Sequence, residues 1–161
     1  MNRTFVVLLL IAVSGVSPLL SARSAQAGDM QMVSGTCDPS SHTAEGPLGT
    51  DLTKRQSRFY CNSAVITFFD DYKGHVMIQF AQKESHHGPI LGFVGRVEPD
   101  GTVMSVDHVY LTPGSPTTVS DGACKFFFKN RHMSSIFCGM KVDETGRRTT
   151  AIVVFNTAPG Q

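Results

Sequence analysis

The stretch that decides the fold is "ACKFFFKNRHMSSIFCGM", residues 123–140. Two cysteines, Cys124 and Cys138, enclose two apolar runs, and the basic tetrapeptide "KNRH" at 129–132 separates the runs. The stretch could be a reactive or metal-binding unit built on the cysteines. It could also be a β-hairpin whose strands are joined by a disulfide. The pairing that its two halves allow decides between these possibilities.

A turn centred on Arg131 pairs the two halves in one register. This register sets Phe128 opposite Ser134, Phe126 opposite Ile136 and Cys124 opposite Cys138. Opposed residues of antiparallel strands lie about 4.5–5.5 Å apart, which is within the Cα separation of about 4.4–6.8 Å that disulfides need. We therefore predict a hairpin with a Cys124–Cys138 disulfide, and we pair the other two cysteines as Cys37–Cys61.

Side chains alternate between the two faces of a strand, which gives the hairpin an inner and an outer face. Phe126 and Phe128 share the face of the two cysteines, and we expect this face to point into the core. Phe127 falls on the outer face between two lysines, and it is the one residue of this stretch for which the hairpin leaves a partner to be found.

The rest of the chain repeats the same kind of pattern. Apolar runs rich in β-branched and aromatic residues alternate with turn sequences at 64–69, 75–81, 90–97, 102–111, 124–129, 134–140 and 149–155. This spacing predicts an all-β fold, a single antiparallel β-barrel or β-sandwich of about seven to eight strands. We expect residues 58–161 to form this β domain. Residues 28–57, which are polar and rich in glycine and proline, are expected to be an irregular N-terminal arm.

The N-terminus has the pattern of a secretory signal peptide. Arg3 supplies the positive charge, residues 5–13 are apolar, and Ala27 ends a small-x-small cleavage sequence. The apolar run is shorter than the about 20 residues that a membrane helix needs. We predict that residues 1–27 are removed, which leaves 161 − 27 = 134 residues. The protein is then periplasmic or secreted, where four cysteines are expected to form two disulfides.

The charge of the mature chain argues against several partners. Removal of Arg3 and Arg23 leaves 14 − 2 = 12 basic residues against 13 acidic ones, a net charge of −1. A nucleic-acid-binding protein would be strongly basic, so we expect no nucleic-acid partner. No second long apolar run follows, so we expect no membrane span after cleavage of the signal peptide.

The loop sequence "ESHHG" contains the candidate metal ligands. Glu84, His86 and His87 are residue types that bind zinc or copper. Adjacent histidines on an extended chain point in opposite directions, and a third ligand such as His75 would have to come from elsewhere. A solvated polar loop is the simpler interpretation, so we assign no metal here.

His108 and Tyr110 are the candidate ligand-binding residues. A turn at "EPDG" sets His108 opposite Gly92, and alternation places it on one face with Met104, Val106 and Tyr110. If that face is interior, His108 and Tyr110 could line the mouth of a small barrel. His108 could equally be a core histidine packed over the glycine. Its neighbour Asp107 would face the other side, so the two could not form a catalytic dyad.

No catalytic or cofactor motif supports an enzyme. The sequence has no G-x-S-x-G, H-E-x-x-H, P-loop or G-x-G-x-x-G motif. We therefore assign no catalytic residue and no cofactor, and we favour a non-catalytic binding or interaction protein of the cell envelope. Its partner would be an envelope or extracellular protein, such as a hydrolase that it inhibits, or a small ligand. The alternative is a metal-dependent or histidine-based hydrolase that uses His86, His87 or His108.

Overall fold

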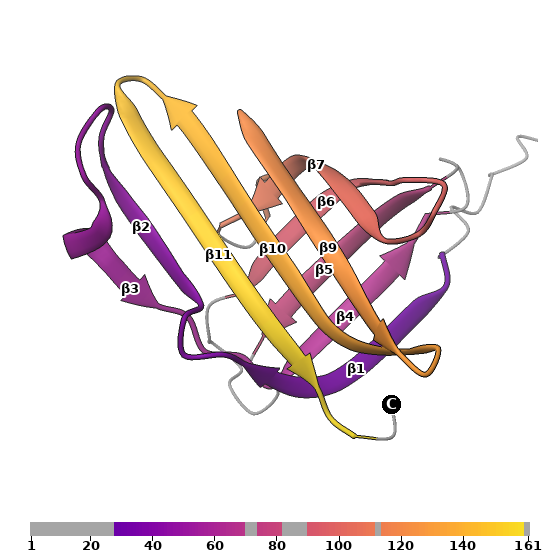
Figure 1. The fold of residues 1–161 in the computed structure, drawn as a ribbon. Helices are drawn as coiled ribbons and strands as arrows, with labels where there is room; N and C mark the ends of the chain where they lie inside the picture. Colours follow the sequence, from indigo (N-terminus) through magenta and orange to yellow (C-terminus); the bar gives the residue numbers. More distant parts are fainter. Residues whose placement is uncertain (1–27, 70–73, 82–89, 112–113, 160–161) are drawn as a thin grey trace, which may run out of the picture.

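Strands dominate the computed structural model, which describes residues 28–69, 74–81, 90–111 and 114–159 (Figure 1). The strands are β1 (Met30–Cys37), β2 (His42–Pro47), β3 (Gln56–Arg58), β4 (Ser63–Phe68), β5 (His75–Ala81), β6 (Leu91–Val97), β7 (Val103–Tyr110), β8 (Thr117–Thr118), β9 (Asp121–Lys129), β10 (His132–Glu144) and β11 (Arg147–Thr157). A 3-10 turn, η1 (Thr53–Arg55), precedes β3. The predicted all-β class is confirmed, whereas the predicted signal peptide, residues 1–27, lies outside the described residues.

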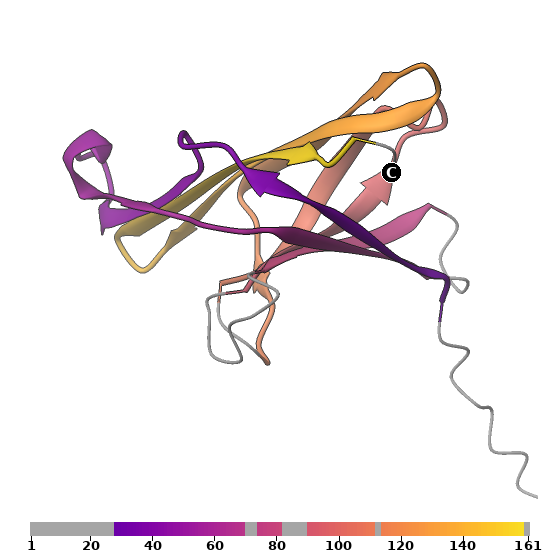
Figure 2. The ribbon, with the colours of Figure 1, turned by 90° about the horizontal axis from the view of Figure 1, so that it is seen from below.

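Eight strands close into an antiparallel barrel. Their order around the wall is β1–β4–β5–β6–β7–β9–β10–β11, and the last residues of β11 pair with β1 to complete the ring. The first half of β11 pairs instead with β2, so that β2 and β3 extend the sheet beyond the barrel, as Figures 1 and 2 show. The seven predicted apolar runs correspond to seven of the barrel strands. Of the two predicted architectures, the barrel is therefore the one that forms.

The eighth barrel strand comes from the segment that was predicted to be irregular, and that prediction was wrong. Residues 28–57 contain β1, β2 and β3. β1 escapes detection because few of its residues are apolar and buried. A side chain at Gly35 would overlap the backbone of Asn156 and lie 2.6 Å from Cζ of Phe155, so the strand needs glycine where the barrel closes. In β2 the buried positions are Ala44 and Gly46, which are also small.

Aromatic and aliphatic side chains pack the middle of the barrel. The ring of Phe80 lies 6.0 Å from that of Phe93 and 5.7 Å from that of Phe155, measured between centroids. The other large side chains that are fully buried are Ile66, Ile78, Met104, Ile136, Val76, Val109 and Val153. They alternate with outward residues along their strands, as a period of two requires. The middle of the barrel is therefore a solid core, because rings and branched side chains fill it from facing walls.

The hairpin of β9 and β10 has the predicted disulfide. Cys124 is opposite Cys138, the two are bonded, and both are fully buried. The turn itself differs from the prediction. Its two central residues, Asn130 and Arg131, have positive φ angles of 53° and 68°. Such a two-residue loop is typical of tight hairpins.

A bulge next to this turn restores the predicted register farther along the strands. Phe128 is opposite Met133, not Ser134 as predicted, because the pairing shifts by one residue between Met133 and Ser135. The extra residue of the bulge compensates for the shorter loop, so Phe126 still faces Ile136. Phe127 points outward as expected, although the ammonium of Lys125 lies 5.4 Å from its ring centroid.

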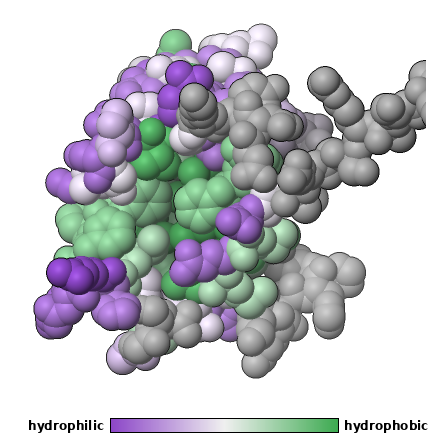
Figure 3. All heavy atoms as spheres, turned by 90° about the vertical axis from the view of Figure 1, so that its right-hand side faces the viewer, coloured by the Kyte–Doolittle hydropathy of each residue, from purple (hydrophilic) through white to green (hydrophobic). Residues whose placement is uncertain are grey.

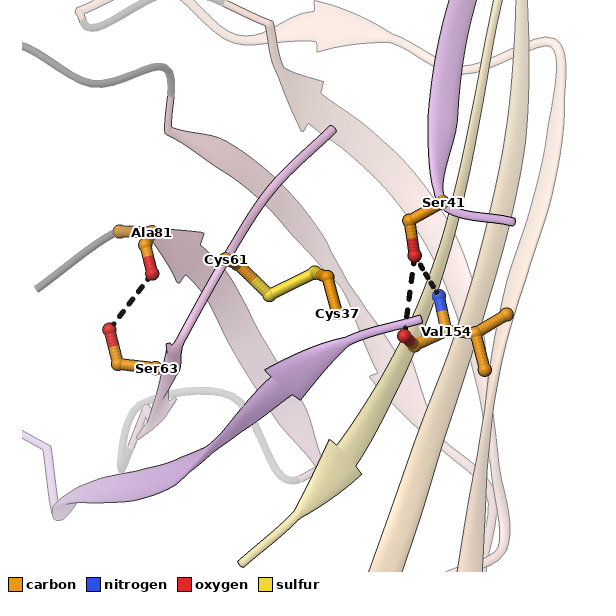
Figure 4. The surroundings of a disulfide bond; sticks show 6 residues. All are labelled: Cys37, Ser41, Cys61, Ser63, Ala81 and Val154. Carbon is orange, nitrogen blue, oxygen red and sulfur yellow. Dashed lines mark hydrogen bonds between the residues drawn. A yellow bond between two sulfur atoms is a disulfide. The ribbon is translucent and has the colours of Figure 1, made fainter. Parts of the chain in front are cut away.

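The second predicted disulfide, Cys37–Cys61, joins the end of β1 to the residues before β4 (Figure 4). The N–H of Cys37 also donates to the carbonyl of Cys61, at 2.9 Å. Close by, the fully buried Ser41 occupies the position between β1 and β2 along β11. Its Oγ donates to the carbonyl of Val154 and accepts from the N–H of Val154. The hydroxyl of Ser41 thus bonds to the backbone of β11 at a position where neither β1 nor β2 pairs with it.

The register of β6 and β7 was predicted wrongly. Gly92 is opposite Tyr110, and His108 is opposite Val94. Two shifts of one residue each cause the difference. Next to the turn Val97 is already opposite Met104, and farther along a bulge leaves Asp107 without a direct partner in β6 where the pairing passes from Gly95 to Val94. One extra residue moves every following side chain of β7 to the other face of the wall.

Candidate functional site

One end of the barrel opens into an apolar pocket, which we call the mouth pocket. Its volume is about 280 Å³. The residues that line it are Ile66, Phe68, Val76, Val97, Gly101, Phe126, Phe128 and Met133. Figure 3, which views the molecule from the right-hand side of Figure 1, shows a hollowed face on which hydrophobic side chains gather. Seven of the eight lining residues thus have apolar side chains, and the eighth is a glycine.

The topology brings these residues together. The pocket is built where β4, β6 and β9 end and where β5, β7 and β10 begin, since neighbouring strands of the barrel are antiparallel. Each of the turns that join these pairs has an apolar, inward-facing residue beside it, such as Phe68, Val97 and Phe128. Three hairpin ends therefore contribute to one pocket, although their sequences are far apart.

The turn between β6 and β7 is held in place by its own side chains. The N–H of Thr102 donates to Asp100 at 2.9 Å, and the Oγ1 of Thr102 donates to the same carboxylate at 2.8 Å. These bonds, the backbone one first, lower the pKa of the Asp100 carboxyl from its ordinary value of 3.8. Gly101 adopts a φ of 73°, which suits glycine, and lines the pocket wall.

Two neighbouring hollows extend the mouth pocket. The first, of about 520 Å³, shares Phe68, Val76 and Val97 with it and is bordered by Arg96 and Glu98. The second, of about 380 Å³, shares Met133 and continues along the start of β10 and the end of β11. We call the second hollow the seam groove; its lining is Lys129, Asn130, His132, Met133, Ser134, Thr157, Ala158 and Pro159.

The lining of the mouth pocket has no acid–base chemistry. Its side chains carry no ionisable group, and the thioether of Met133 is the one metal-ligating group among them, so the lining offers no general acid or base. These side chains offer apolar surface that water contacts, because Phe68 is 43% exposed and Phe128 is 52% exposed. Covering such surface with an apolar group is favourable by about 25 cal/mol for each Å² removed from water.

His108 and Tyr110 do not lie at this end of the barrel interior. The bulge at Asp107 turns both Asp107 and His108 to the exposed outer wall, so the predicted inward face of His108 was wrong. Tyr110 also lies on the outer wall, where its ring covers Gly92; a Cβ on Gly92 would be 3.3 Å from that of Tyr110. Their predicted role in ligand binding is untested and, on this wall, does not involve the mouth pocket.

The other histidines give one pair on the outer wall. Nε2 of His75 lies 3.4 Å from Oδ2 of Asp107, a long contact between β5 and β7. Within the described ranges, no group of three or more His, Cys, Asp or Glu could hold a metal ion. The weak metal candidates Glu84, His86 and His87 lie outside those ranges, so that prediction stays untested.

Sequence reasoning missed the mouth pocket, although a usable sequence signal exists. Phe68, Val97, Phe128 and Met133 each stand within a few residues of a turn, at strand ends where polar residues would be easier to solvate. Apolar residues at several hairpin ends on the same side of a barrel are the sequence signal of an exposed apolar patch at that end. The pattern requires the strand order, which the sequence alone did not provide.

Over the residues that the structure describes, no helix has the length and apolar character needed to cross a membrane. Comparison with protein-family models, with curated proteins and with solved structures finds no match to this chain.

Proposed function

We propose that the protein is an exported, non-catalytic binding protein whose mouth pocket receives an apolar group of a protein partner. The observation that carries the proposal is the composition of the pocket, in which no lining residue has a polar side chain. Phe68 and Phe128 stand at its rim and keep about half of their surface in water. Exposed aromatic side chains around a hollow are typical of interaction sites.

The apolar chemistry of the pocket favours a protein partner over a free small molecule. Pockets for drug-sized ligands are about 300–1,000 Å³ and contain a few polar groups that orient the ligand. The mouth pocket, about 280 Å³ without the hollows that extend it, is at the lower end of this range, and its lining has no such group. A single large apolar side chain, of the kind that anchors protein interfaces, needs only this much space and no polar contact.

The proposed location rests on the cysteines and on the N-terminal sequence. All four cysteines are paired in two disulfides, which are typical of oxidising compartments. Together with the predicted signal peptide at 1–27, they support the periplasm or the extracellular space. An extracytoplasmic hydrolase that the protein inhibits is one concrete partner, because an inhibitor needs a docking surface and no catalytic group.

Site-specific photo-crosslinking tests the proposal. Purified protein with p-benzoylphenylalanine in place of Phe68, at the pocket rim, is irradiated with exported proteins of the source cells. We expect a discrete adduct that is absent when the probe replaces Phe137, which is similarly exposed but lies on the outer wall. Excess wild type or Phe137→Ser protein should suppress the adduct, whereas excess Phe128→Ser should not. Equal adducts from both probe positions, or equal suppression by both competitors, would contradict the proposal.

The alternative function is a hydrolase built on histidines. Among the described residues, the contact between His75 and Asp107 favours it, because a carboxylate beside an imidazole is common in hydrolytic sites. Such an enzyme should lose activity on ester or peptide substrates when His86, His87 or His108 is replaced by alanine in a protein that remains folded. A metal-dependent version also requires a stoichiometric ion, so metal analysis that finds none would eliminate it.

A further inference from the structure

We propose that the open edge of β1, beside the mouth pocket, receives an extended segment of the partner as an additional strand. This inference rests on the proposed function and specifies how the partner presents its apolar group. The segment would pair with the backbone of Met30 and Met32 and direct alternate side chains toward the mouth pocket. The edge would thus recognise an extended peptide by its main-chain hydrogen bonds and by apolar side chains at every second position.

The edge is open because β1 has two different neighbours along its length. It pairs with β4 from Met30 to Ser34, but with β11 only from Gly35 to Cys37. Along residues 30–33, no other strand of the described residues lies on the opposite side. Figure 2 shows the N-terminal half of β1 running away from the end of β11. The ring of the barrel is therefore complete at one end and incomplete at the mouth.

The backbone groups that face this opening can be identified from the alternation of hydrogen bonds. Toward β4, the N–H of Phe68 donates to the carbonyl of Asp29, and the N–H of Gly35 donates to that of Asn62. On the opposite side, the N–H of Ala158 donates to the carbonyl of Ser34 at 2.8 Å. Odd-numbered residues of β1 thus bond toward β4, so the N–H and C=O of Met30 and Met32 point to the open side.

β11 stops just before it would cover these groups. Its last strand residue is Thr157, opposite Gly35, and Ala158 makes the final contact with β1. Pro159 follows, which has no N–H to continue a ladder. The seam groove, about 380 Å³ in volume, lies at this point between the end of β11 and the start of β10. An added strand would occupy the place that a longer β11 would have filled.

The register of the closed part predicts where the added side chains would point. Thr157 faces the interior opposite Gly35, so residues opposite Val33 and Gln31 on an added antiparallel strand would face the interior as well. They would enter beside Met133, which lines both the seam groove and the mouth pocket. The edge therefore supplies main-chain hydrogen bonds, and the pocket selects an apolar side chain.

Peptides from a phage-displayed library of random twelve-residue sequences, selected on the purified, oxidised protein, test the inference. We expect the enriched peptides to have apolar residues at alternate positions. For the best one, made with a fluorescent label, affinity is measured by fluorescence polarisation. Methylation of single backbone amides should weaken binding about tenfold at every second position, where the N–H faces β1, and little at the positions between.

Variants of Met32 complete the test on the protein side. Met32→Pro removes the N–H on the open edge and leaves the pairing with β4 intact, since proline is tolerated on edges whose N–H faces outward. We expect about a tenfold loss of peptide affinity, whereas Met32→Ala, which keeps the N–H, should bind within about threefold of wild type. If Met32→Pro unfolds, the amide-methylation pattern decides alone.

The outcomes separate this inference from the proposed function. If Phe128→Ser abolishes peptide binding but Met32→Pro and amide methylation have no effect, the pocket binds and strand addition is wrong. If neither Phe128→Ser nor Met32→Pro matters, both are wrong. A dimer of the protein in sedimentation, lost in Met32→Pro, would show that a second copy occupies the edge and would overturn the proposed partner.

Discussion

Cys124 and Cys138 face each other directly across β9 and β10, with 4.0 Å between their Cα atoms, and their sulfurs are bonded inside the barrel wall. Neither side chain is reached by solvent. The bond thus joins neighbouring strands of a hairpin in the core. Because both sulfurs are bonded and buried, neither cysteine can act as a nucleophile or a metal ligand. It also fixes the register of the two strands whose ends form one side of the mouth pocket.

Replacing both of these cysteines by alanine should destabilise the protein by about 3 kcal/mol, because the unfolded chain regains the freedom of the closed loop. The sequence separation of the pair is 14, against 24 for Cys37 and Cys61. The same loop-entropy argument predicts that Cys37→Ala with Cys61→Ala costs about 0.5 kcal/mol more. Urea denaturation of both double variants measures the difference. A hairpin disulfide whose loss leaves the free energy of unfolding unchanged would contradict this account.

The sequence was sufficient to predict the hairpin disulfide because its geometry follows from one period, and Cys37–Cys61 was then the pairing that remained for the other two cysteines. Phe126, Cys124 and their partners repeat every second residue on both sides of a turn, so a hairpin register with the cysteines opposed also turns Phe126 into the core. The one-residue shift of the pairing at the tip of the hairpin did not affect the predicted disulfide. A bulge after Met133 returns the pairing to the register that a turn on Arg131 predicts.

The features that the sequence did not predict depend on backbone irregularities and on closure. The bulge at Asp107 reverses the faces of His108 and Tyr110, and its only sequence trace is Gly95, where a Cβ would overlap the backbone of Ser105. The sequence of β1 resembles that of a loop, because the place where the barrel closes requires a residue as small as Gly35. The mouth pocket needed the strand order, since its residues come from three separate hairpins.

Gly35→Ala should destabilise the protein by about 1–3 kcal/mol, because the new methyl group would meet the backbone of Asn156 and the ring of Phe155, which cannot move without opening the seam. Gly139→Ala is a matched control in β10, where the added Cβ would have only Cε1 of Phe137 within reach, at 3.8 Å. The control should be neutral or slightly stabilising. The unfolding temperatures of both variants give the comparison. Equal effects would show that contact with Asn156 and Phe155 is not the reason why residue 35 is glycine.

Ser41→Ala should cost about 1–3 kcal/mol, since it leaves the buried N–H of Val154 without the oxygen that accepts from it at 3.0 Å (Figure 4). The neighbouring Ser40→Ala is the control. Ser40 is exposed and its hydroxyl donates to Asp38, so its loss should change stability by less than about 0.5 kcal/mol. Hydrogen exchange at Val154, measured by NMR, should become faster in Ser41→Ala alone. Unchanged protection there would mean that another acceptor replaces the hydroxyl.

The ion pair of Asp143 and Arg148 predicts how stability responds to acid. Arg148 donates from Nε to Oδ1 at 2.7 Å and from Nη2 to Oδ2 at 2.8 Å, and these bonds lower the pKa of the Asp143 carboxyl below its ordinary value of 3.8. A carboxyl whose pKa is lower in the folded state contributes stability above its unfolded pKa and loses it as the pH falls through the folded pKa.

Asp143→Asn should therefore lose less stability than wild type between neutral pH and about pH 3. The effect is small because the pair is exposed to solvent. Glu144→Gln removes the same charge at the next position and leaves the Asp143–Arg148 pair in place, so it should keep the wild-type pH response. Urea titrations at several pH values, in constant salt, test this. Identical acid sensitivity of Asp143→Asn and wild type would show that the pair does not contribute.

Phe126 and Phe128 stand two residues apart on β9 and line the same pocket, yet they should respond differently to substitution. Phe126 is 8% exposed and belongs to the core, so Phe126→Ala should cost about 3–5 kcal/mol. Phe128 is 52% exposed, so Phe128→Ala should change the free energy of unfolding by no more than about 1 kcal/mol while it abolishes partner and peptide binding. Urea denaturation and fluorescence polarisation on the same samples give both quantities. A large loss of stability in Phe128→Ala would mean that the fold itself needs this ring, and the main reason to regard the rim of the pocket as a binding surface would disappear.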